Sequence, residues 1–457
     1  MPHDRASLGR RLGRTLRLGA ATARVSTGWA AATLLGGAGG RSAARSLLRS
    51  SSARVAATLG QMKGLAMKVG QYLSFALPDL PPELAEALAS LQTRSAPRPF
   101  EPIAEMVEAE LGRPLADAFE SFEPEPVAAA SIGQVHRATL PGGAPVAVKV
   151  QYPDVALQVR ADLASVPLLV RLLRLVVPGV EAEAVAAEIR ARILEELDYR
   201  AEARWQEAFA ARWAGHPFFA IPRVVPSHST GRVLTTAWAE GRDFAAALQD
   251  PEPVRSAHGE ILFRFLLGNL LGAGEILADP HPGNYRFDER GERSTFLDFG
   301  CVKELPPQVR AGMRQLFRAA LDADGEGQRR AAERLGVLGG AGRSRAVVEA
   351  LVQLYLPFRR DARGPFPAPL SAAALRAASG PGMGRVRKAL RVPGDLPFVN
   401  RTVVGLYAVL ARLGAVAGWH GIAREYAFGD PPATPLGVRE RRWRAARPPA
   451  PPTGRQA

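Results

Sequence analysis

The stretch 277-LADPHPGNYRFDERGERSTFLDFG-300 decides the fold and the chemistry that we predict for this chain. Asp279 and Asn284 lie five positions apart in a turn-forming Pro/His/Pro/Gly run, and a polar segment then leads to an apolar strand that ends at Asp298. Metal-assisted phosphoryl transfer needs one carboxylate at the acceptor, together with an amide oxygen and a second carboxylate that hold Mg²⁺. The alternative is a surface hairpin in which the same side chains only shape turns. The spacing of the three groups favours the phosphoryl-transfer site.

Composition sets the outer limits. The chain has 457 residues, of which 47% are hydrophobic and 23% charged, which is typical of a globular protein with two or three packed units. The net charge of +15 is weak evidence for a nucleic-acid partner, because a general arginine bias explains it as well, and we expect no nucleic acid. A single cysteine, Cys301, excludes intramolecular disulfides. Seven scattered histidines show no HExxH spacing, so we expect no zinc centre.

Both ends of the chain differ from its middle. Residues 1–45 are rich in arginine and small residues, which is typical of a flexible leader, a membrane-surface arm or a transit peptide. The apolar run 25–40 is too short and too rich in glycine to span a bilayer. Residues 402–422 are apolar but contain Arg412, which favours a buried C-terminal helix over a transmembrane span. The Pro/Arg-rich tail 431–457 is predicted to be disordered.

An amphipathic helix is predicted between about residues 45 and 75, where apolar residues recur at three- and four-residue spacing. Within it, Lys68 and Gln71 lie one turn apart on one face, beside Gly70, which allows another backbone to approach closely. Lys and Gln on helices ordinarily face water, so this pattern alone indicates little.

Residues 127–140 and 145–152 are predicted to form two strands of a hairpin that turns at 141–143. Lys149 lies inside the apolar second strand and needs a partner, because an unpaired buried charge is costly. In a nucleotide site the partners are phosphate and a helical glutamate, whereas a lysine on an edge strand would point to solvent.

Acidic residues follow in the predicted helix 184–209, where Asp198 and Glu202 share one face and Glu195 and Glu196 lie within two turns. One of these acids could pair with Lys149, but spacing alone does not say which. A further strand is predicted over 232–238, then a break at 239–241, where adenine would stack. A helix through 261–276 would deliver Asp279, and 306–428 is predicted to be mostly helical.

In combination, these motifs resemble the UbiB/AarF family of atypical kinases. The motifs that carry the resemblance are KVGQ at 68–71, AAASIGQVHRA at 128–138, AVKV ending at 150, ELDYRAE at 196–202, DPHPGN at 279–284 and LDFG at 297–300. The resemblance implies an α+β, two-lobed protein-kinase-like fold with a helical KxGQ extension packed over the active site. The implied parts are a basic leader 1–45, a KxGQ extension 46–125, an N-lobe 126–241, a helical C-lobe 242–430 and a tail 431–457.

The resemblance also implies roles for single residues. Lys149 would pair with Glu202, Asn284 and Asp298 would hold Mg²⁺, and Asp279 would be the catalytic carboxylate. The residues expected at the ATP phosphates, besides that pair, are Ala128, Ala129, Ala130 and Ser131. Lys68 and Gln71 would fold over the site and meet Glu196 and Asp198, in space that a protein substrate would otherwise need.

Two departures from the sequence pattern of ordinary protein kinases indicate which class of molecule accepts the phosphoryl group. No His-Arg precedes Asp279, and no APE-like segment follows Gly300, so we expect no phosphorylation of proteins in trans. The first hypothesis is an atypical kinase or ATPase that uses ATP and Mg²⁺ in support of isoprenoid-quinone biosynthesis or lipid homeostasis. Its partners would be an isoprenoid or lipid-like small molecule and an anionic membrane surface. It would be cytoplasmic and peripheral on the inner face of a membrane, with organellar import as the alternative.

Two other functions remain open from the sequence. One is a small-molecule phosphotransferase of the aminoglycoside or choline kinase type, whose catalytic loops also contain a D-x-HPGN-like pattern. The KxGQ stretch and the alanine-rich loop argue against it. The other is a nucleotide-binding scaffold without turnover. The joint presence of Lys149, Asp279, Asn284 and Asp298 argues for chemistry, because a scaffold needs no catalytic carboxylate.

Overall fold

The computed structural model of the chain describes residues 97–129, 132–163, 187, 190–191, 194–338, 345–367 and 395–447. The chain divides into two compact units, each built from separate segments of the sequence. The smaller unit comprises 1–106, 125–135 and 150–197, and the larger unit comprises 107–124, 136–149 and 198–457. The predicted KxGQ helix, the basic leader and the last residues of the tail lie outside the described residues.

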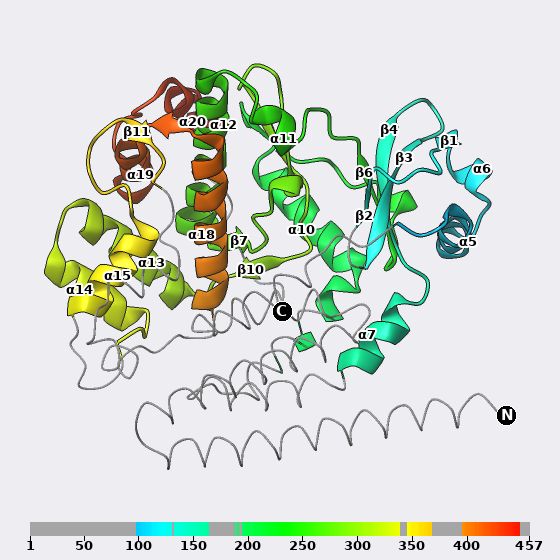
Figure 1. The fold of residues 1–457 in the computed structure, drawn as a ribbon, viewed down its shortest axis with the longest axis horizontal. Coiled ribbons are helices and arrows are strands. Elements are labelled where there is room, and N and C mark those ends of the chain that lie inside the picture. Colours follow the sequence, from blue (N-terminus) through cyan, green and yellow to red (C-terminus); the bar gives the residue numbers. More distant parts are fainter. Residues whose placement is uncertain are drawn as a thin grey trace, which may run out of the picture. The chain divides into compact units, whose positions relative to one another are not determined.

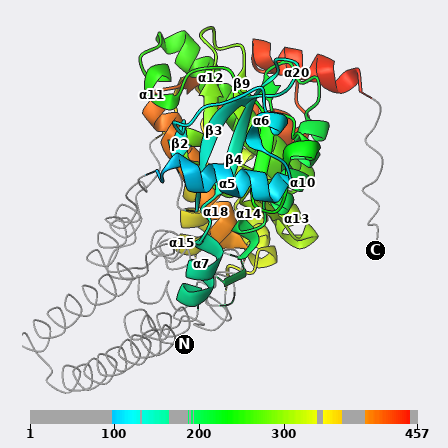
Figure 2. The same cartoon turned by 90° about the vertical axis from the view of Figure 1, so that its right-hand side faces the viewer.

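A five-stranded sheet contains the predicted hairpin. Its order is β1-β3-β4-β6, with β2 paired to β3, and its strands are β1 (Ser121–Phe122), β2 (Ala128–Ala129), β3 (Gly133–Thr139), β4 (Pro145–Gln151) and β6 (Val233–Ala237). Figures 1 and 2 both show β3 and β4 side by side. Gly142 and Gly143 have φ of 99° and 85°, as a tight hairpin turn requires. Val146, Val148 and Val150 are buried, which is the period-2 pattern of a strand.

In the described part of the smaller unit, Arg98 contacts residues that follow β2 and β4. Arg98 forms an ion pair with Asp154 and lies over the ring of Tyr152, 4.5 Å from its centroid. Its backbone N–H donates to the side chain of buried Gln134 at 2.9 Å. Tyr152 N–H donates to Ile132 O at 2.9 Å, just before α7 (Val155–Leu163) begins. These contacts fix the backbone that directly follows the alanine-rich loop.

Helices make up most of the rest. They are α5 (Phe100–Leu111), α6 (Leu115–Ala118), α10 (Tyr199–Arg212), α11 (Phe244–Ala247), α12 (Glu252–Leu267), α13 (Pro307–Leu321), α14 (Gly325–Arg334), α15 (Arg345–Tyr355), α18 (Leu396–Leu413), α19 (Trp419–Phe428) and α20 (Pro435–Ala445). In the larger unit, α12 packs on α18 and α13 packs on α14 and α19 (Figure 1). Helices and strands together confirm the α+β class that the sequence predicts.

Short pairs of β-strands lie within and beside the stretch 277–300. β7 (Glu275–Leu277) pairs antiparallel with β10 (Val302–Glu304), and β8 (Tyr285–Phe287) pairs antiparallel with β9 (Ser294–Phe296). β5 (Phe219–Ala220) lies parallel to β9, and β11 (Gly364–Pro365) pairs with β12 (Val416–Ala417). The two antiparallel pairs set where the polar residues of this stretch meet.

Aromatic rings form the core beneath these strands. Phe265 of α12 stacks on Phe296 of β9 with a centroid distance of 3.7 Å. Phe299 is fully buried and packs on Phe209 of α10 at 5.2 Å between centroids. Because Phe299 directly follows Asp298, this packing fixes the position of Asp298 relative to α10.

Two predicted helices are interrupted. The predicted helix 184–209 is not continuous, because Asp198 has extended backbone and its carboxylate accepts from Arg200 N at 3.0 Å as the N-cap of α10. Asp198 and Glu202 therefore do not share a helical face. The predicted helix through 261–276 ends earlier. α12 continues into a π-helical turn (Gly268–Ala273), Gly274 takes a φ of 77°, and Ile276 lies in β7.

The C-terminal predictions also need correction. The predicted helix 402–422 is two helices, α18 and α19, because Gly414 is left-handed with φ 60° and ends α18. The prediction of disorder from Pro431 is wrong for Pro435–Ala445, which forms α20 with Gly437 and Glu440 buried. Of the described helices, only α18 is long and apolar enough to cross a membrane, and 56% of it is buried inside the structure, as in a core helix.

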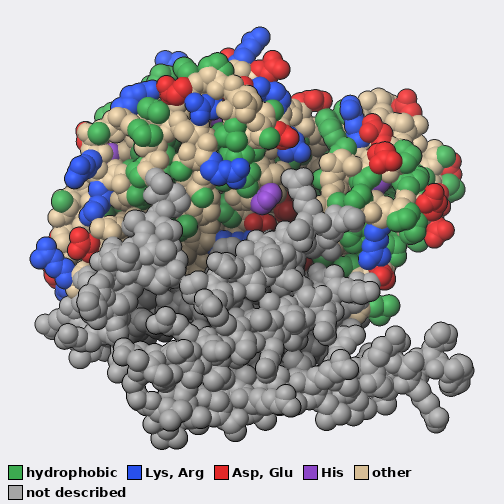
Figure 3. Space-filling model, in the orientation of Figure 1, with side chains coloured by type: hydrophobic (Ala, Val, Ile, Leu, Met, Phe, Trp, Pro, Cys, Tyr) green, Lys and Arg blue, Asp and Glu red, His purple; other side chains and the backbone are tan. Residues whose placement is uncertain are grey.

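The basic side chains are spread out on the face of the described structure that Figure 3 shows. On the face shown in Figure 3, Lys and Arg side chains are scattered among the other residue types and do not gather into one patch. The high net charge is therefore not concentrated on the described part of this face.

Candidate active site

An ion pair joins β4 to α10 in the larger unit. Lys149 Nζ lies 2.7 and 2.8 Å from the two carboxylate oxygens of Glu202. The side chain of Glu202 is 6% exposed and that of Lys149 is 22% exposed. Lys149 Nζ also lies 5.0 Å from the centroid of the Tyr199 ring. Among the acids that precede or begin α10, Glu202 is thus the one that meets the strand lysine, as the resemblance implies.

The charges around Lys149 keep it protonated. Burial alone would lower the pKa of Lys149, but the negative charges of Asp298 and Glu202 outweigh burial and raise the pKa well above its usual value. The ammonium therefore faces two carboxylates from different segments. Such a group remains a fixed positive charge at neutral pH and suits contact with phosphate.

The short strand pairs bring three polar residues to one region. Ala278 N donates to Cys301 O at 2.7 Å, so Asp279 lies two residues beyond the end of β7 and directly after this backbone bond. Leu297 N donates to Asn284 O at 3.0 Å, which places Asn284 beside the residue that precedes Asp298. Asn284 Nδ2 donates to Asp279 O at 3.0 Å. The three residues predicted from the sequence to act together therefore come from neighbouring turns.

Asn284 and Asp298 have the chemistry of a magnesium site. The amide nitrogen of Asn284 is used in its bond to Asp279 O, so the amide oxygen is the end left for a ligand. One oxygen of Asp298 accepts from Gly300 N at 2.8 Å, which orients the carboxylate. Mg²⁺ prefers hard oxygen ligands and retains waters, so an amide oxygen and a carboxylate suffice. The donor set therefore fits the metal.

Gly300 allows two carboxylates to approach one backbone. A Cβ at this position would lie 3.1 Å from Glu202 Oε2 and 3.2 Å from Asp298 Oδ1. A methyl group there would displace one of the two carboxylates. The glycine thus brings Glu202 of α10, the partner of Lys149, close to Asp298, which is predicted to hold the metal.

Arg401 was not expected at the site from the sequence. It lies on α18 with an 8% exposed side chain, and its Nη2 donates to Asp279 Oδ1 at 2.7 Å. The segment before Asp279 lacks the His-Arg of ordinary protein kinases, and here an arginine from a distant helix contacts the carboxylate instead. The signal that could have found it is a charged residue on an otherwise apolar helix face.

Only some of the remaining predicted site residues lie in the part of the chain that the structure describes. Ala128 and Ala129 form β2 and pair with Val135 and Gln134 in the smaller unit. Asp198 caps α10, and Glu196 precedes it. The other predicted residues of the alanine-rich loop and of the KxGQ stretch lie outside the described residues. They are Ala130, Ser131, Lys68 and Gln71.

Comparison with models of protein families identifies the family of this chain. The model of the ABC1 atypical kinase-like domain matches residues 90–332, which is more than half of the chain. The chain belongs to this family, so the UbiB/AarF-like resemblance is confirmed. With its mixed helices and sheet, the chain has the α+β protein-kinase-like fold that the resemblance implied.

Individual relatives agree with this family assignment. The atypical kinase COQ8 of Saccharomyces cerevisiae mitochondria is 29% identical over 366 residues, which are 79% of this chain and 73% of that protein. The mitochondrial atypical kinase COQ8B of Rattus norvegicus is 30% identical over 374 residues, 81% of this chain and 70% of that protein. The solved structure of the Rv3197–erythromycin complex from Mycobacterium tuberculosis is 29% identical with a TM-score of 0.60. The match covers 86% of this chain and 100% of that one.

Proposed function

We propose that this atypical kinase-like chain binds Mg-ATP and transfers or hydrolyses its terminal phosphoryl group. The observation that carries the proposal is the buried Lys149–Glu202 ion pair, with Asp298 close enough to raise the pKa of the same lysine. A charged lysine held by a helical glutamate beside a metal-binding aspartate is the arrangement that orients nucleotide phosphates in kinases.

Each residue has a distinct task in this proposal. Lys149 binds the phosphates, and Glu202 fixes the position of its ammonium. Asn284 and Asp298 hold Mg²⁺, which when bound neutralises charge that develops on the phosphates. Asp279 orients the attacking hydroxyl or water, and Arg401 holds the Asp279 carboxylate in place through one oxygen.

The acceptor is water or a small molecule rather than a protein. After Gly300, the chain passes through β10 to Pro306 and enters α13 at Pro307. This leaves no room for a long peptide-docking loop of the kind that ordinary protein kinases carry between their DFG and APE motifs. An acceptor that needs no peptide platform agrees with this short connection.

The proposed setting is a membrane surface in support of isoprenoid-quinone metabolism. This part of the proposal is supported by the family resemblance and by relatives named as mitochondrial COQ8 kinases. Arginines between residues 5 and 24 could bind anionic lipid headgroups, with about 1 kcal/mol from each residue near the surface. Salt should then release the protein from vesicles.

The test measures phosphate release by the purified chain with Mg-ATP, with and without anionic vesicles and a quinone-precursor analogue. We expect turnover in the parent, loss of turnover in Asp279→Asn, and stimulation by vesicles that salt reverses. Mg-ATP binding without turnover under every condition would favour the scaffold. A phosphorylated analogue in place of released phosphate would identify a small-molecule acceptor and would also agree with the proposal.

A further inference from the structure

Side chains from α20 and from the turn after it contact the C-terminal end of α10 and the residues that follow it. The last carbonyl groups of a helix have no partner within the helix and must be satisfied by other groups. Arg447 donates to Ala211 O at 3.2 Å and to Arg212 O. Trp443 Nε1 donates to Ala214 O at 3.2 Å. A cation at this end also interacts favourably with the helix dipole.

Stacked rings reinforce the same contact. The Trp443 ring stacks on Trp213, the C-cap residue of α10, with 5.7 Å between centroids and 22° between planes. It also meets the His216 ring edge-on at 4.5 Å. Arg439 donates to Pro217 O at 3.0 Å. The contact between α20 and the end of α10 is therefore polar and aromatic at once.

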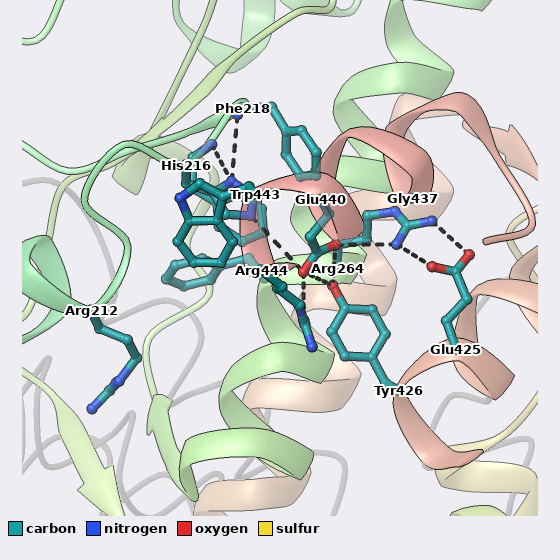
Figure 4. A network of polar contacts seen from close by, with 12 residues as sticks. Arg212, His216, Phe218, Arg264, Glu425, Tyr426, Gly437, Glu440, Trp443 and Arg444 are labelled. Atoms are coloured by element: carbon teal, nitrogen blue, oxygen red, sulfur yellow. Dashed lines mark hydrogen bonds and ion pairs between the residues drawn. The ribbon is translucent and has the colours of Figure 1, made fainter. Parts of the chain in front are cut away.

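α20 is in turn fixed to the core of the larger unit. Glu440 is 2% exposed and accepts hydrogen bonds from Tyr426 at 2.7 Å and from Arg264 at 3.2 Å. Arg264 of α12 is fully buried and also donates to Glu425 of α19 at 2.8 and 2.9 Å. Figure 4 shows these side chains converging on Glu440 and Arg264 from three helices. A Cβ on Gly437 would lie 2.6 Å from Arg264 Nη2, so the helix approaches as closely as its backbone allows.

The other end of α10 carries the proposed nucleotide chemistry. Glu202 lies in its first turn and pairs with Lys149, and Phe209 packs on Phe299 in its second half. A helix moves as a rigid element, so a tilt at its last turn displaces Glu202 at its first. In protein kinases, the position of the equivalent helix decides whether the Lys–Glu pair forms.

We infer that Trp443 and Arg447 are positioning residues that hold α10, and through it Glu202, in the geometry that pairs with Lys149. The inference rests on the proposed function, since it concerns the same ion pair. It assigns α20 as a C-terminal clamp, anchored by Glu440 and Arg264. Release of this clamp is then the event that frees α10 to move away from Lys149.

The test compares Trp443→Phe and Arg447→Ala, alone and combined, with the parent. Trp443→Phe keeps the ring and loses the N–H donor, while Arg447→Lys keeps the charge and should restore part of the effect. Arg441→Ala is the matched control, because it removes an exposed arginine from the same helix. The measurements are amide hydrogen exchange in α10 and the Kd for Mg-ATP, each after a thermal melt has established folding.

We expect faster exchange of the α10 amides in the combined variant and a Kd for Mg-ATP raised about fivefold, comparable to the loss of one hydrogen bond. In a Glu202→Gln background the same two substitutions should leave the Kd unchanged, because the pair through which they act is already lost. A purely structural role would give the same penalty in both backgrounds.

The outcomes separate the clamp from the proposed function. Unchanged exchange in α10, or a Kd penalty equal in both backgrounds, overturns the clamp. If the parent does not bind Mg-ATP at all, the proposed function fails, while the exchange measurement still decides whether α20 holds α10. If Lys149 and Glu202 variants weaken binding and the α20 variants do not, the clamp alone is refuted.

Discussion

Lys149→Met should destabilise the larger unit as well as disable it. The substitution removes the ammonium that lies 2.7 Å from Glu202 and leaves that carboxylate 6% exposed with no lysine partner. It also leaves the charges of Glu202 and Asp298 on either side of Gly300 without the cation between them. Removing one partner of a buried ion pair is strongly destabilising, because the other charge stays buried without it.

The magnitude follows from the burial. Breaking a fully buried ion pair by removing one partner costs about 3–5 kcal/mol. Since Lys149 is 22% exposed, we expect the lower end, about 3 kcal/mol in the free energy of unfolding. Replacing both partners, Lys149→Met with Glu202→Leu, removes the orphaned charge and should recover at least half of this loss.

Urea unfolding followed by tryptophan fluorescence measures the effect, because Trp213 is the buried C-cap residue of α10. Arg223→Met is the control, because it removes one partner of a more exposed ion pair, in which the side chain of Arg223 is 63% exposed and that of Glu207 is 33% exposed. The reasoning is refuted if Lys149→Met unfolds within about 0.5 kcal/mol of the parent, the range of an ordinary surface substitution. It is also refuted if the double variant is less stable than the single one.

Three further results are expected. Arg401→Gln should lower kcat for ATP hydrolysis by about tenfold with little change in KM, because Arg401 contacts Asp279. A change in KM alone would contradict this, and Arg412→Gln on the same helix is the control. Gly300→Ala should weaken Mg-ATP binding measured by calorimetry, since its Cβ would lie 3.1 Å from Glu202 Oε2; parental affinity would contradict the close approach. Glu440 is buried, which opposes ionisation, yet His216, Arg444 and Arg264 lower its pKa from 4.5 to about 2. Its stabilisation, about 3 kcal/mol, is therefore present above pH 4.5 and lost as the pH falls toward 2. In urea titrations, the loss of stability over this pH range should be smaller by about this amount in Glu440→Gln than in the parent.

The local features of the fold could be predicted from the sequence. The Pro-Gly-Gly turn at 141–143 and the flanking alternation of valines specify the hairpin of β3 and β4. The stretch 277–300 contains both the turn residues and the apolar strand that bring Asp279, Asn284 and Asp298 to neighbouring turns. In these segments the residues that determine the structure are close in sequence, so local rules suffice.

Contacts over long sequence separations could not be predicted in this way. Arg401 meets Asp279 across 122 positions, and Arg264 meets Glu440 across 176. The Pro/Arg composition after residue 431 favours disorder locally, and the buried contacts of Glu440 add to the local start signal of α20, the N-cap Thr434 followed by Pro435. The interruption of the predicted helix 184–209 before α10, in contrast, has a local signal in the sequence. Asp198 is a typical N-cap residue, and this local signal was available but outweighed by the apolar periodicity around it.

Isothermal titration of Mg-ATP into the parent chain and into Asp298→Asn tests the central claim most directly. The variant keeps the size of the side chain and the oxygen that accepts from Gly300 N, but it loses the negative charge that the metal requires. The account predicts magnesium-dependent binding in the parent, at least tenfold weaker binding in the variant, and similar thermal melts for the two proteins. Equal affinity of the two proteins for Mg-ATP would contradict it.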